Sequence, residues 1–119
     1  MVKLVGNNFK LIVIIVNKNL SRRVIKACKK AGLEGATAFP ARGTGTHNAG
    51  SIFGVEVEEK KDIVLCLTPT NLVDKVISKV RAAARLDRPG TGIAFVVNSK
   101  NICGIAHKLN SNNFSNTKS

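Results

Sequence analysis

Four short apolar runs divide the chain and predict β-strands. They are rich in Val and Ile, and KLIVIIV is apolar at nearly every position, as a strand covered on both faces would be. The second run, GATAFPAR, is weaker, and Pro40 favours a sheet edge because proline cannot donate a ladder hydrogen bond. The predicted strands span residues 10–16, 35–42, 62–68 and 92–97, and a short fifth strand is expected in NICGIAH.

Two amphipathic helices are predicted between these strands. The segments NKNLSRRVIKACKKAGLEG and PTNLVDKVISKVRAAARL place apolar residues at helical spacing, so each helix has one face to bury. Gly32 stands where a helix commonly ends in the left-handed conformation. The buried positions are expected to be Leu20, Val24, Ala27, Cys28 and Ala31 in the first helix, and Leu72, Val73, Val76, Ile77, Val80 and Ala84 in the second.

The order strand–helix–strand occurs twice, which gives βαββαβ. This order predicts an α+β fold, a ferredoxin-like sandwich with a short extra C-terminal strand. Two helices would cover one face of the sheet and leave the other face open. Because the strands are nearly continuous apolar runs, the open face would expose aliphatic side chains. Such a patch is a liability for a monomer, so the sheets are expected to pack against each other in an oligomer.

A single domain accounts for the length of 119 residues. Residues 1–109 are expected to form it, and the polar segment NSNNFSNTKS, residues 110–119, is expected to be disordered. Aromatic residues are scarce, with five Phe and neither Tyr nor Trp, so the core must be aliphatic.

The formal net charge of +12 predicts attraction to anions. Nucleic acid, nucleotide phosphates, an anionic membrane surface and an acidic protein all fit the charge alone. The basic residues do not form a run of five or more, as a nucleic-acid tail often does. Several lie on the first predicted helix, where a solvated face is the simpler interpretation: Arg22, Arg23, Lys26, Lys29 and Lys30.

The three cysteines, Cys28, Cys66 and Cys103, are odd in number and widely spaced. They form no CxxC pair, so neither a zinc site nor a disulfide framework is indicated. Each lies among apolar residues, and all three are predicted to be core residues in a reducing compartment. The longest apolar run is too short to span a bilayer. A cytoplasmic location is therefore expected.

Two glycine-rich loops are the main candidates for ligand binding. Residues 39–54, FPARGTGTHNAGSIFG, and residues 84–95, ARLDRPGTGIAF, both contain an arginine followed by Gly-Thr-Gly. Guanidinium, hydroxyl and exposed backbone N–H groups suit a phosphate. The first loop does not match the P-loop consensus, however, and a plain flexible connection remains the alternative. If an oligomer joined one loop from each of two chains, they would line a positive cleft for a nucleotide phosphate chain.

The sequence gives no case for catalysis or for a metal site. The only histidines, His47 and His107, have no Cys or carboxylate at metal-ligand spacing. We find no Ser-His-Asp order, nucleophile elbow or carboxylate pair with an acid–base role. A protein that is not an enzyme and has no covalent cofactor is expected.

At the level of whole segments, the chain resembles the PII nitrogen-regulatory signalling family. The resemblance runs from Lys10 to about His107 and is carried by KACKKAGLEGATAFPARGTG, by LTPTNLVDKVISKVRAAARLDRPGTGIAFV and by the length between them. It implies a homotrimer whose sheets face the threefold axis and whose nucleotide sites lie between subunits. It also implies two functional loops, a T-loop at about residues 44–59 that contacts partners and a B-loop at about residues 86–92.

Two sets of site residues follow from the loops and the resemblance. An adenine nucleotide (ADP, AMP or ATP) is expected at Arg42, Gly43, Thr44, Gly45, Arg85, Arg88, Gly90, Thr91 and Gly92. A target protein is expected at the T-loop residues Thr46, His47, Asn48, Ser51, Ile52 and Phe53.

Several family positions differ in this chain. The absence of tyrosine excludes uridylylation of a T-loop tyrosine, and His47 stands at about the place of the T-loop glutamine that helps hold magnesium and 2-oxoglutarate. The two C-terminal arginines that grip ATP phosphates correspond to about Gly104 and Ala106. Their loss would remove roughly 1.5–3 kcal/mol each, so a smaller nucleotide or another anion is favoured. Lys61 lies near the family's T-loop stem lysine.

The predicted function is signal transduction: an anionic effector binds between subunits and the T-loop regulates a transporter or metabolic enzyme. An RNA-binding ferredoxin-like domain is the alternative. Nucleic acid is the less favoured partner, because the strands lack the paired aromatics of RNA-recognition sheets and Phe95 alone cannot form that platform. An acylphosphatase-like enzyme is less favoured again, because residues 17–19 do not form a phosphate cradle.

Overall fold

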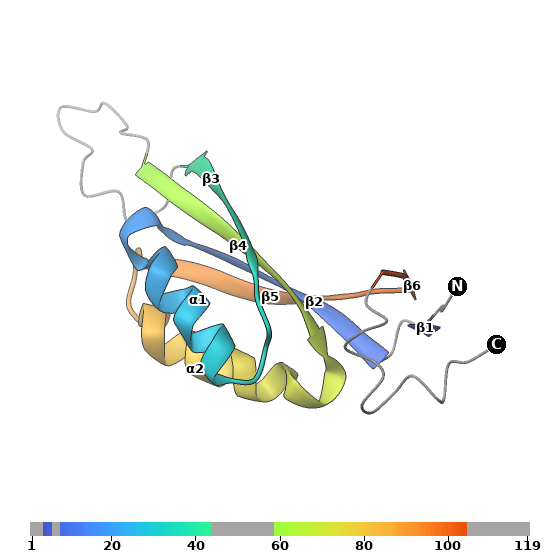
Figure 1. Cartoon of the computed structure of the whole chain (residues 1–119). Coiled ribbons are helices and arrows are strands. Elements are labelled where there is room, and N and C mark those ends of the chain that lie inside the picture. The colour runs from blue at the N-terminus through green and yellow to red at the C-terminus, as the bar shows by residue number, and fades with distance from the viewer. Residues whose placement is uncertain (1–3, 6–7, 44–58, 105–119) are drawn as a thin grey trace, which may run out of the picture.

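The computed structural model describes residues 4–5, 8–43 and 59–104. Ten elements follow one another in this part of the chain (Figure 1). They are β1 (Leu4–Val5), β2 (Phe9–Asn17), the 3-10 turn η2 (Lys18–Leu20), α1 (Ser21–Lys30), β3 (Thr37–Gly43), β4 (Glu59–Pro69), the 3-10 turn η3 (Thr70–Leu72), α2 (Val73–Ala84), β5 (Gly92–Asn98) and β6 (Asn101–Ile102).

The main sheet is antiparallel and has the strand order β3-β4-β2-β5. Its two central strands are the first and third of the βαββαβ order, which is the ferredoxin-like arrangement. Both helices cover the same face of the sheet (Figure 1). The predicted α+β sandwich is confirmed, and β3, which contains Pro40, lies at an edge as expected.

The core lies between the sheet and the helices. Along β2, every second side chain points to the helices, so Ile12, Ile14 and Val16 are fully buried. Val24 of α1 and Val80 of α2 meet them from the other layer. Burying one such aliphatic side chain contributes about 1.5–3 kcal/mol, so these alternating positions hold the helices to the sheet.

The opposite face of the sheet is uncovered and apolar. Register places Val13 opposite Phe95 and Leu11 opposite Val97, on the side that the helices leave open. Large side chains remain exposed across the strands: Phe39, Leu67, Ile93, Phe95, Val96 and Val97. The expected open apolar face is therefore present. Val96 is the exception among these residues, because its pairing with Ile12 turns it toward the helix layer.

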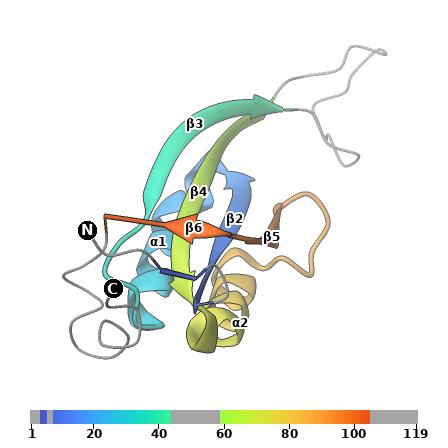
Figure 2. The same ribbon diagram turned by 90° about the vertical axis from the view of Figure 1, so that its right-hand side faces the viewer.

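One prediction about the C-terminal part is confirmed and another needs correction. The short extra strand exists as β6, but it pairs with β1 outside the main sheet, and β1 was not predicted (Figure 2). Cys103, predicted in the core, is exposed, whereas Cys28 and Cys66 are buried. In β6, which directly precedes Cys103, Ile102 is the buried residue. The two-residue pair of β1 and β6 has no second layer that could cover both of its faces. The predicted disordered tail, residues 110–119, lies outside the described residues.

Candidate functional site

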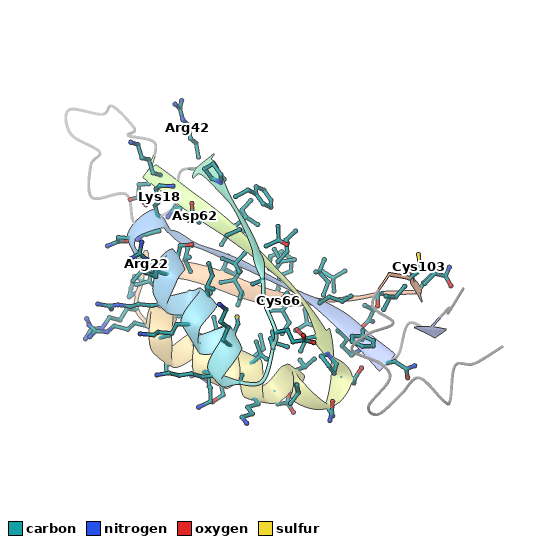
Figure 3. The ribbon with its side chains drawn as sticks, viewed as in Figure 1. Lys18, Arg22, Arg42, Asp62, Cys66 and Cys103 are labelled. Carbon is teal, nitrogen blue, oxygen red and sulfur yellow. The ribbon has the colours of Figure 1, made fainter. Side chains whose placement is uncertain are left out.

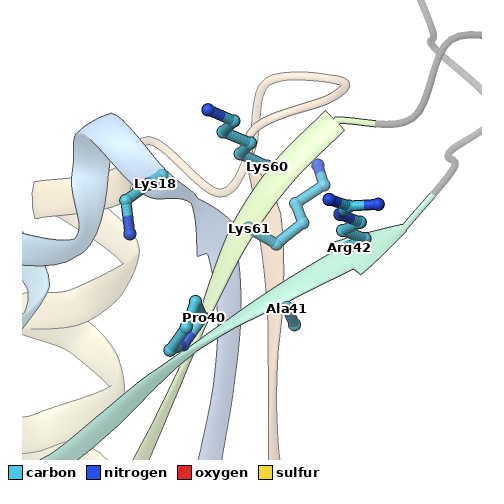
Figure 4. Close-up of a pocket in the computed structure, with 6 residues that line it drawn as sticks. All are labelled: Lys18, Pro40, Ala41, Arg42, Lys60 and Lys61. Carbon is cyan, nitrogen blue, oxygen red and sulfur yellow. The ribbon is translucent and has the colours of Figure 1, made fainter.

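An open pocket of about 410 Å³ lies where β3 and β4 lead into segment 44–58 (Figure 4). Its lining combines three positions of β3, two of β4 and one of the turn after β2. Four of the six are cationic: the lining residues are Lys18, Pro40, Ala41, Arg42, Lys60 and Lys61. A pocket with this lining is suited to an anion.

Strand register places two of the lining cations side by side, whereas Lys61, the next residue after Lys60, points to the other face of the sheet. Arg42 pairs with Lys60 across the β3–β4 ladder, and Lys61 pairs with Asn17 across the β4–β2 ladder. Side chains directly opposite each other lie on the same face, and like charges in such a pair destabilise a sheet. An anion placed between Arg42 and Lys60 would offset that repulsion.

Carboxylates pair with two of the lining lysines. Lys61 donates from its Nζ to Glu59 Oε2 at 2.8 Å, and Lys18 forms an ion pair with Asp62 Oδ1 at 3.3 Å. The side chain of Lys18 is still 56% exposed, whereas that of Lys61 is 14% exposed. These ion pairs involve two of the four lining cations, and none of the described lining residues is itself a carboxylate, so the pocket is suited to an anionic ligand.

Asn17, the last residue of β2, connects the pocket to the predicted B-loop. Its Oδ1 accepts a hydrogen bond from Lys61 Nζ at 2.6 Å, and its Nδ2 donates to Gly90 O at 3.0 Å. Its backbone N–H also donates to Thr91 O at 3.2 Å. One amide side chain thus joins the foot of segment 44–58 to the loop between α2 and β5.

The predicted B-loop has a defined shape of its own. Arg85 ends α2 in the left-handed conformation, with a φ of 52°, and turns the chain out of the helix. The Thr91 hydroxyl then shares its one proton between two carbonyl oxygens, Arg85 O at 2.9 Å and Arg88 O at 3.3 Å. Thr91 therefore stabilises the loop, and Arg85 and Arg88 remain exposed on its surface.

The start of β5 is closely packed against β2. Gly92 has a φ of +157°, and a Cβ added there would collide with the carbonyl oxygen of Ile15. Only glycine allows the loop to enter the sheet at this point, because any side chain would push the strands apart.

The predicted nucleotide residues lie at one end of the sheet but at opposite edges. Ala41, Lys61, Asn17 and Thr91 form a row across the four strands. Three strand spacings separate its ends by about 14 Å. Arg85 and Arg88 accordingly do not line the pocket that contains Arg42.

The predicted residues Thr44 and Gly45 lie outside the described residues, as does the predicted partner loop of Thr46, His47, Asn48, Ser51, Ile52 and Phe53. Gly43, the last residue of β3, pairs with Glu59 at the point where the two strands leave the sheet.

Sequence reasoning missed Asn17, Lys18 and Lys60. The charged stretch EEKK has no alternating apolar pattern, so the first residues of β4 gave no strand signal. Extending the 62–68 strand by three residues would have placed Lys60 opposite Arg42.

Two further features bear on the site. Among residues 4–5, 8–43 and 59–104, no group of three or more His, Cys, Asp or Glu side chains is arranged to hold a metal ion. Neither of the two described helices has the length and apolar content that crossing a bilayer requires.

Comparison with known proteins supports the resemblance found in the sequence. No curated protein sequence is significantly similar to this chain. The crystal structure of Arabidopsis thaliana PII bound to citrate is similar in fold, with a TM-score of 0.63 and 23% sequence identity over 82% of this chain and 83% of that chain. The family model for nitrogen regulatory protein P-II matches residues 9–108, which include both helices, the whole main sheet and the pocket. The chain therefore belongs to the nitrogen regulatory protein P-II family.

Proposed function

We propose that this protein is a trimeric PII signal protein without enzymatic activity. In this proposal a small anionic effector, an adenine nucleotide or another anionic metabolite, binds between subunits. Its binding controls a target protein, a transporter or a metabolic enzyme, through residues 44–59. The cationic pocket at the foot of that segment carries the proposal.

The pocket supports an anion as the effector. Its described lining has four cations and no carboxylate, and Arg42 and Lys60 face each other across a ladder with like charge. Hydrogen bonds from such groups to an anionic oxygen contribute about 1.5–3 kcal/mol each. The Arabidopsis relative of the same fold is a citrate complex, so a small polyanion binds to that protein.

Two features of the sheet support assembly with further copies of the chain. Its open apolar face carries exposed Ile93 and Phe95, which a second copy would cover. The pocket with Arg42 and the loop with Arg88 lie at opposite edges of the sheet, so a single chain does not surround a ligand from both sides. A neighbouring copy that presents its B-loop to the pocket would complete the site.

We expect the effector to be smaller than ATP. The two C-terminal arginines that the family uses on ATP phosphates correspond here to about Gly104 and Ala106. The guanidinium groups of the predicted nucleotide site are Arg42 at the pocket, Arg88 in the B-loop and Arg85 directly before that loop. These suit the one or two phosphates of AMP or ADP, or the carboxylates of a small metabolite, better than a triphosphate.

In this proposal, the bound effector acts on segment 44–58 through Lys61. Its Nζ is shared between Glu59 and Asn17, and Glu59 is the first residue after that segment. An anion that binds Lys61 competes with Glu59 for the same ammonium group. This competition regulates the loop only if the anion prefers one loop state over the other.

The test is isothermal titration of the full chain with ATP, ADP and AMP, with and without 2-oxoglutarate and magnesium, and with citrate. We expect one site per chain. Lys60→Gln and Arg88→Ala should each weaken binding by roughly 10- to 150-fold, because each removes one charged hydrogen bond.

Lys100→Gln is the matched control, since Lys100 is an exposed cation beyond β5 and lies outside the pocket lining. It should leave the affinity unchanged. Failure of all these anions to bind, or equal weakening by Lys100→Gln, would contradict the proposed site.

A further inference from the structure

The outer face of the helix layer carries a second, separate concentration of positive charge. Helix α1 has five basic residues and no acidic residue among its ten positions. The neighbouring helix α2 adds Lys75, Lys79 and Arg81, with one acidic residue, Asp74, in its first turn. In Figure 3 the nitrogen-tipped side chains of α1, Arg22 among them, extend away from the sheet.

These cations border a groove between the two helices. An open pocket of about 420 Å³ has a floor of Ala27, Ala82 and Ala83. The small floor residues keep the groove hollow, and longer side chains rise at its rims. The rim residues are Arg23, Lys26 and Lys30 of α1 and Lys79 of α2, and all four are exposed. The groove is referred to below as the helix groove.

The charge of the helix groove is not balanced by paired carboxylates. The ion pairs found among the described residues join Lys18 to Asp62, Lys61 to Glu59 and Arg81 to Asp87. None of these pairs includes a rim residue. The rim therefore presents four positive charges to the solvent along one side of the molecule.

The helix groove offers charge without large apolar anchors. Among the described residues, the exposed large hydrophobic side chains all lie on β3, β4 and β5. A protein partner normally buries an apolar centre, and an interfacial helix inserts Leu, Phe or Trp side chains into the membrane. A surface of cations over alanine fits neither of these partners well. It suits a polyanion whose charges repeat along a backbone.

We infer that the helix groove binds the phosphate backbone of double-stranded nucleic acid without reading its sequence. This binding surface is distinct from the effector pocket, and it lies on the face of the sheet opposite the open apolar face. Phosphate contacts alone support such binding, because each neutralised phosphate releases condensed counterions. The groove lacks the aromatic side chains on which unpaired bases stack, so a duplex is favoured over a single strand.

The spacing of the rim residues fits a phosphate backbone. Arg23, Lys26 and Lys30 lie three and four residues apart, so they follow one side of α1. Seven residues of helix rise about 10 Å. That length matches about three phosphates of one strand at an axial spacing of about 3.4 Å. Lys79 reaches the same backbone from the other rim.

The test measures binding of the full chain to a labelled, random-sequence DNA duplex of about 20 base pairs, at several salt concentrations. Four neutralised phosphates predict a slope of about −3.6 for log K against log salt, or about a 150-fold loss of affinity between 50 and 200 mM. Lys26→Gln combined with Lys30→Gln should reduce the slope to about −1.8. Circular dichroism will check that the variants fold, which exposed positions favour.

Arg22→Gln combined with Lys29→Gln is the matched control. It removes the same charge from the same helix, but neither residue lines the groove. The control should keep a slope near −3.6. An equal loss of slope in both variants would contradict the helix groove as the site.

Two further ligands test whether a membrane surface or an acidic protein binds the helix groove instead of a duplex. Vesicles containing anionic phosphatidylserine and a poly-glutamate peptide are titrated under the same conditions. Weaker binding to both than to the duplex is the expected result. No binding to the duplex at low salt, or tighter binding to vesicles or poly-glutamate, would overturn the inference.

Discussion

Lys61 donates a hydrogen bond of 2.6 Å from its Nζ to Asn17 Oδ1, and this contact joins the two loop regions of the protein. Lys61 stands three residues after segment 44–58, and the other end of the Asn17 amide donates to Gly90 O in the predicted B-loop at 3.0 Å. A side chain that bonds both loops holds their positions relative to each other. The two bonds need one acceptor and one donor atom on the same side chain, and the amide of Asn17 provides both.

Two different replacements of Asn17 should distinguish the contribution of its bond to Lys61 from that of its bond to Gly90. Asn17→Ala removes both and should lower the free energy of unfolding by about 1–3 kcal/mol, since each hydrogen bond contributes roughly 0.5–1.5 kcal/mol. Asn17→Asp keeps an acceptor for Lys61 but directs a carboxylate oxygen at Gly90 O, so it should release the B-loop alone. Urea denaturation measures the first effect, and amide hydrogen exchange at Thr91 and Gly92 measures the second.

Asn19→Ala is the control for this comparison, because Asn19 is an exposed asparagine in the turn that follows β2. It should change stability by less than about 0.5 kcal/mol. An Asn17→Ala variant as stable as this control would show that the amide does not hold the loops.

Gly92 should be intolerant of any side chain. In Gly92→Ala the new Cβ would collide with Ile15 O and with the side chain of Val16, and the φ of +157° adds backbone strain. We expect a loss of about 2–5 kcal/mol in the free energy of unfolding, from overpacking and strain together. Thermal and urea denaturation measure it. Gly35→Ala is the control, since nothing lies within 4 Å of a Cβ there, and it should cost little.

Much of the fold was predictable because the signals were local. Apolar runs located the four main strands, and helical spacing located both helices, because burial of one face dictates those patterns. The ends of strands were less predictable. β4 begins at Glu59 and not at residue 62, because its first residues are charged and owe their strand conformation to pairing with β3.

The site was predictable only in part, because it depends on distant residues. Arg42 and Lys61 could be identified from loop composition and family resemblance. The role of Asn17 could not, because its contact with Gly90 spans 73 positions of the sequence. Cys103 shows the same limit: apolar neighbours in NICGIAH indicated burial, yet the β1–β6 pair leaves that side chain exposed.

The buried thiols Cys28 and Cys66 should make stability depend on alkaline pH. Their Sγ atoms lie 3.5 Å apart. The hydrogen bond with Cys28 and then burial raise the pKa of Cys66 well above its usual range. A raised pKa means that the folded state keeps a proton that the unfolded state releases above about pH 8.5. The stability contributed by this thiol is therefore complete below that pH and falls as the pH rises.

Urea denaturation of wild type and the Cys28→Ala, Cys66→Ala double variant at about pH 8 and about pH 10 measures this linkage. Both thiols are replaced because Cys28, left alone, would stay buried but lose the hydrogen bond that lowers its pKa. The difference in unfolding free energy between the two proteins should shift against the wild type by up to about 2 kcal/mol over that range. Cys103→Ala is the control, because it removes an exposed thiol and leaves the buried pair intact. A pH-independent difference for the double variant would contradict the raised pKa.

The open face of the sheet should be the surface through which copies associate, and two adjacent valines of β5 test this. Val97 and Val96 are each 41% exposed, but Val97 pairs with Leu11 on the open face and Val96 pairs with Ile12 on the helix face. Val97→Lys would place a charge in the sheet-to-sheet contact, where desolvation is costly, so sedimentation should show monomers. Val96→Lys adds the same charge one residue away and should remain trimeric. Trimers in both variants would place the oligomer contact elsewhere, and monomeric wild-type protein would contradict the proposed assembly itself.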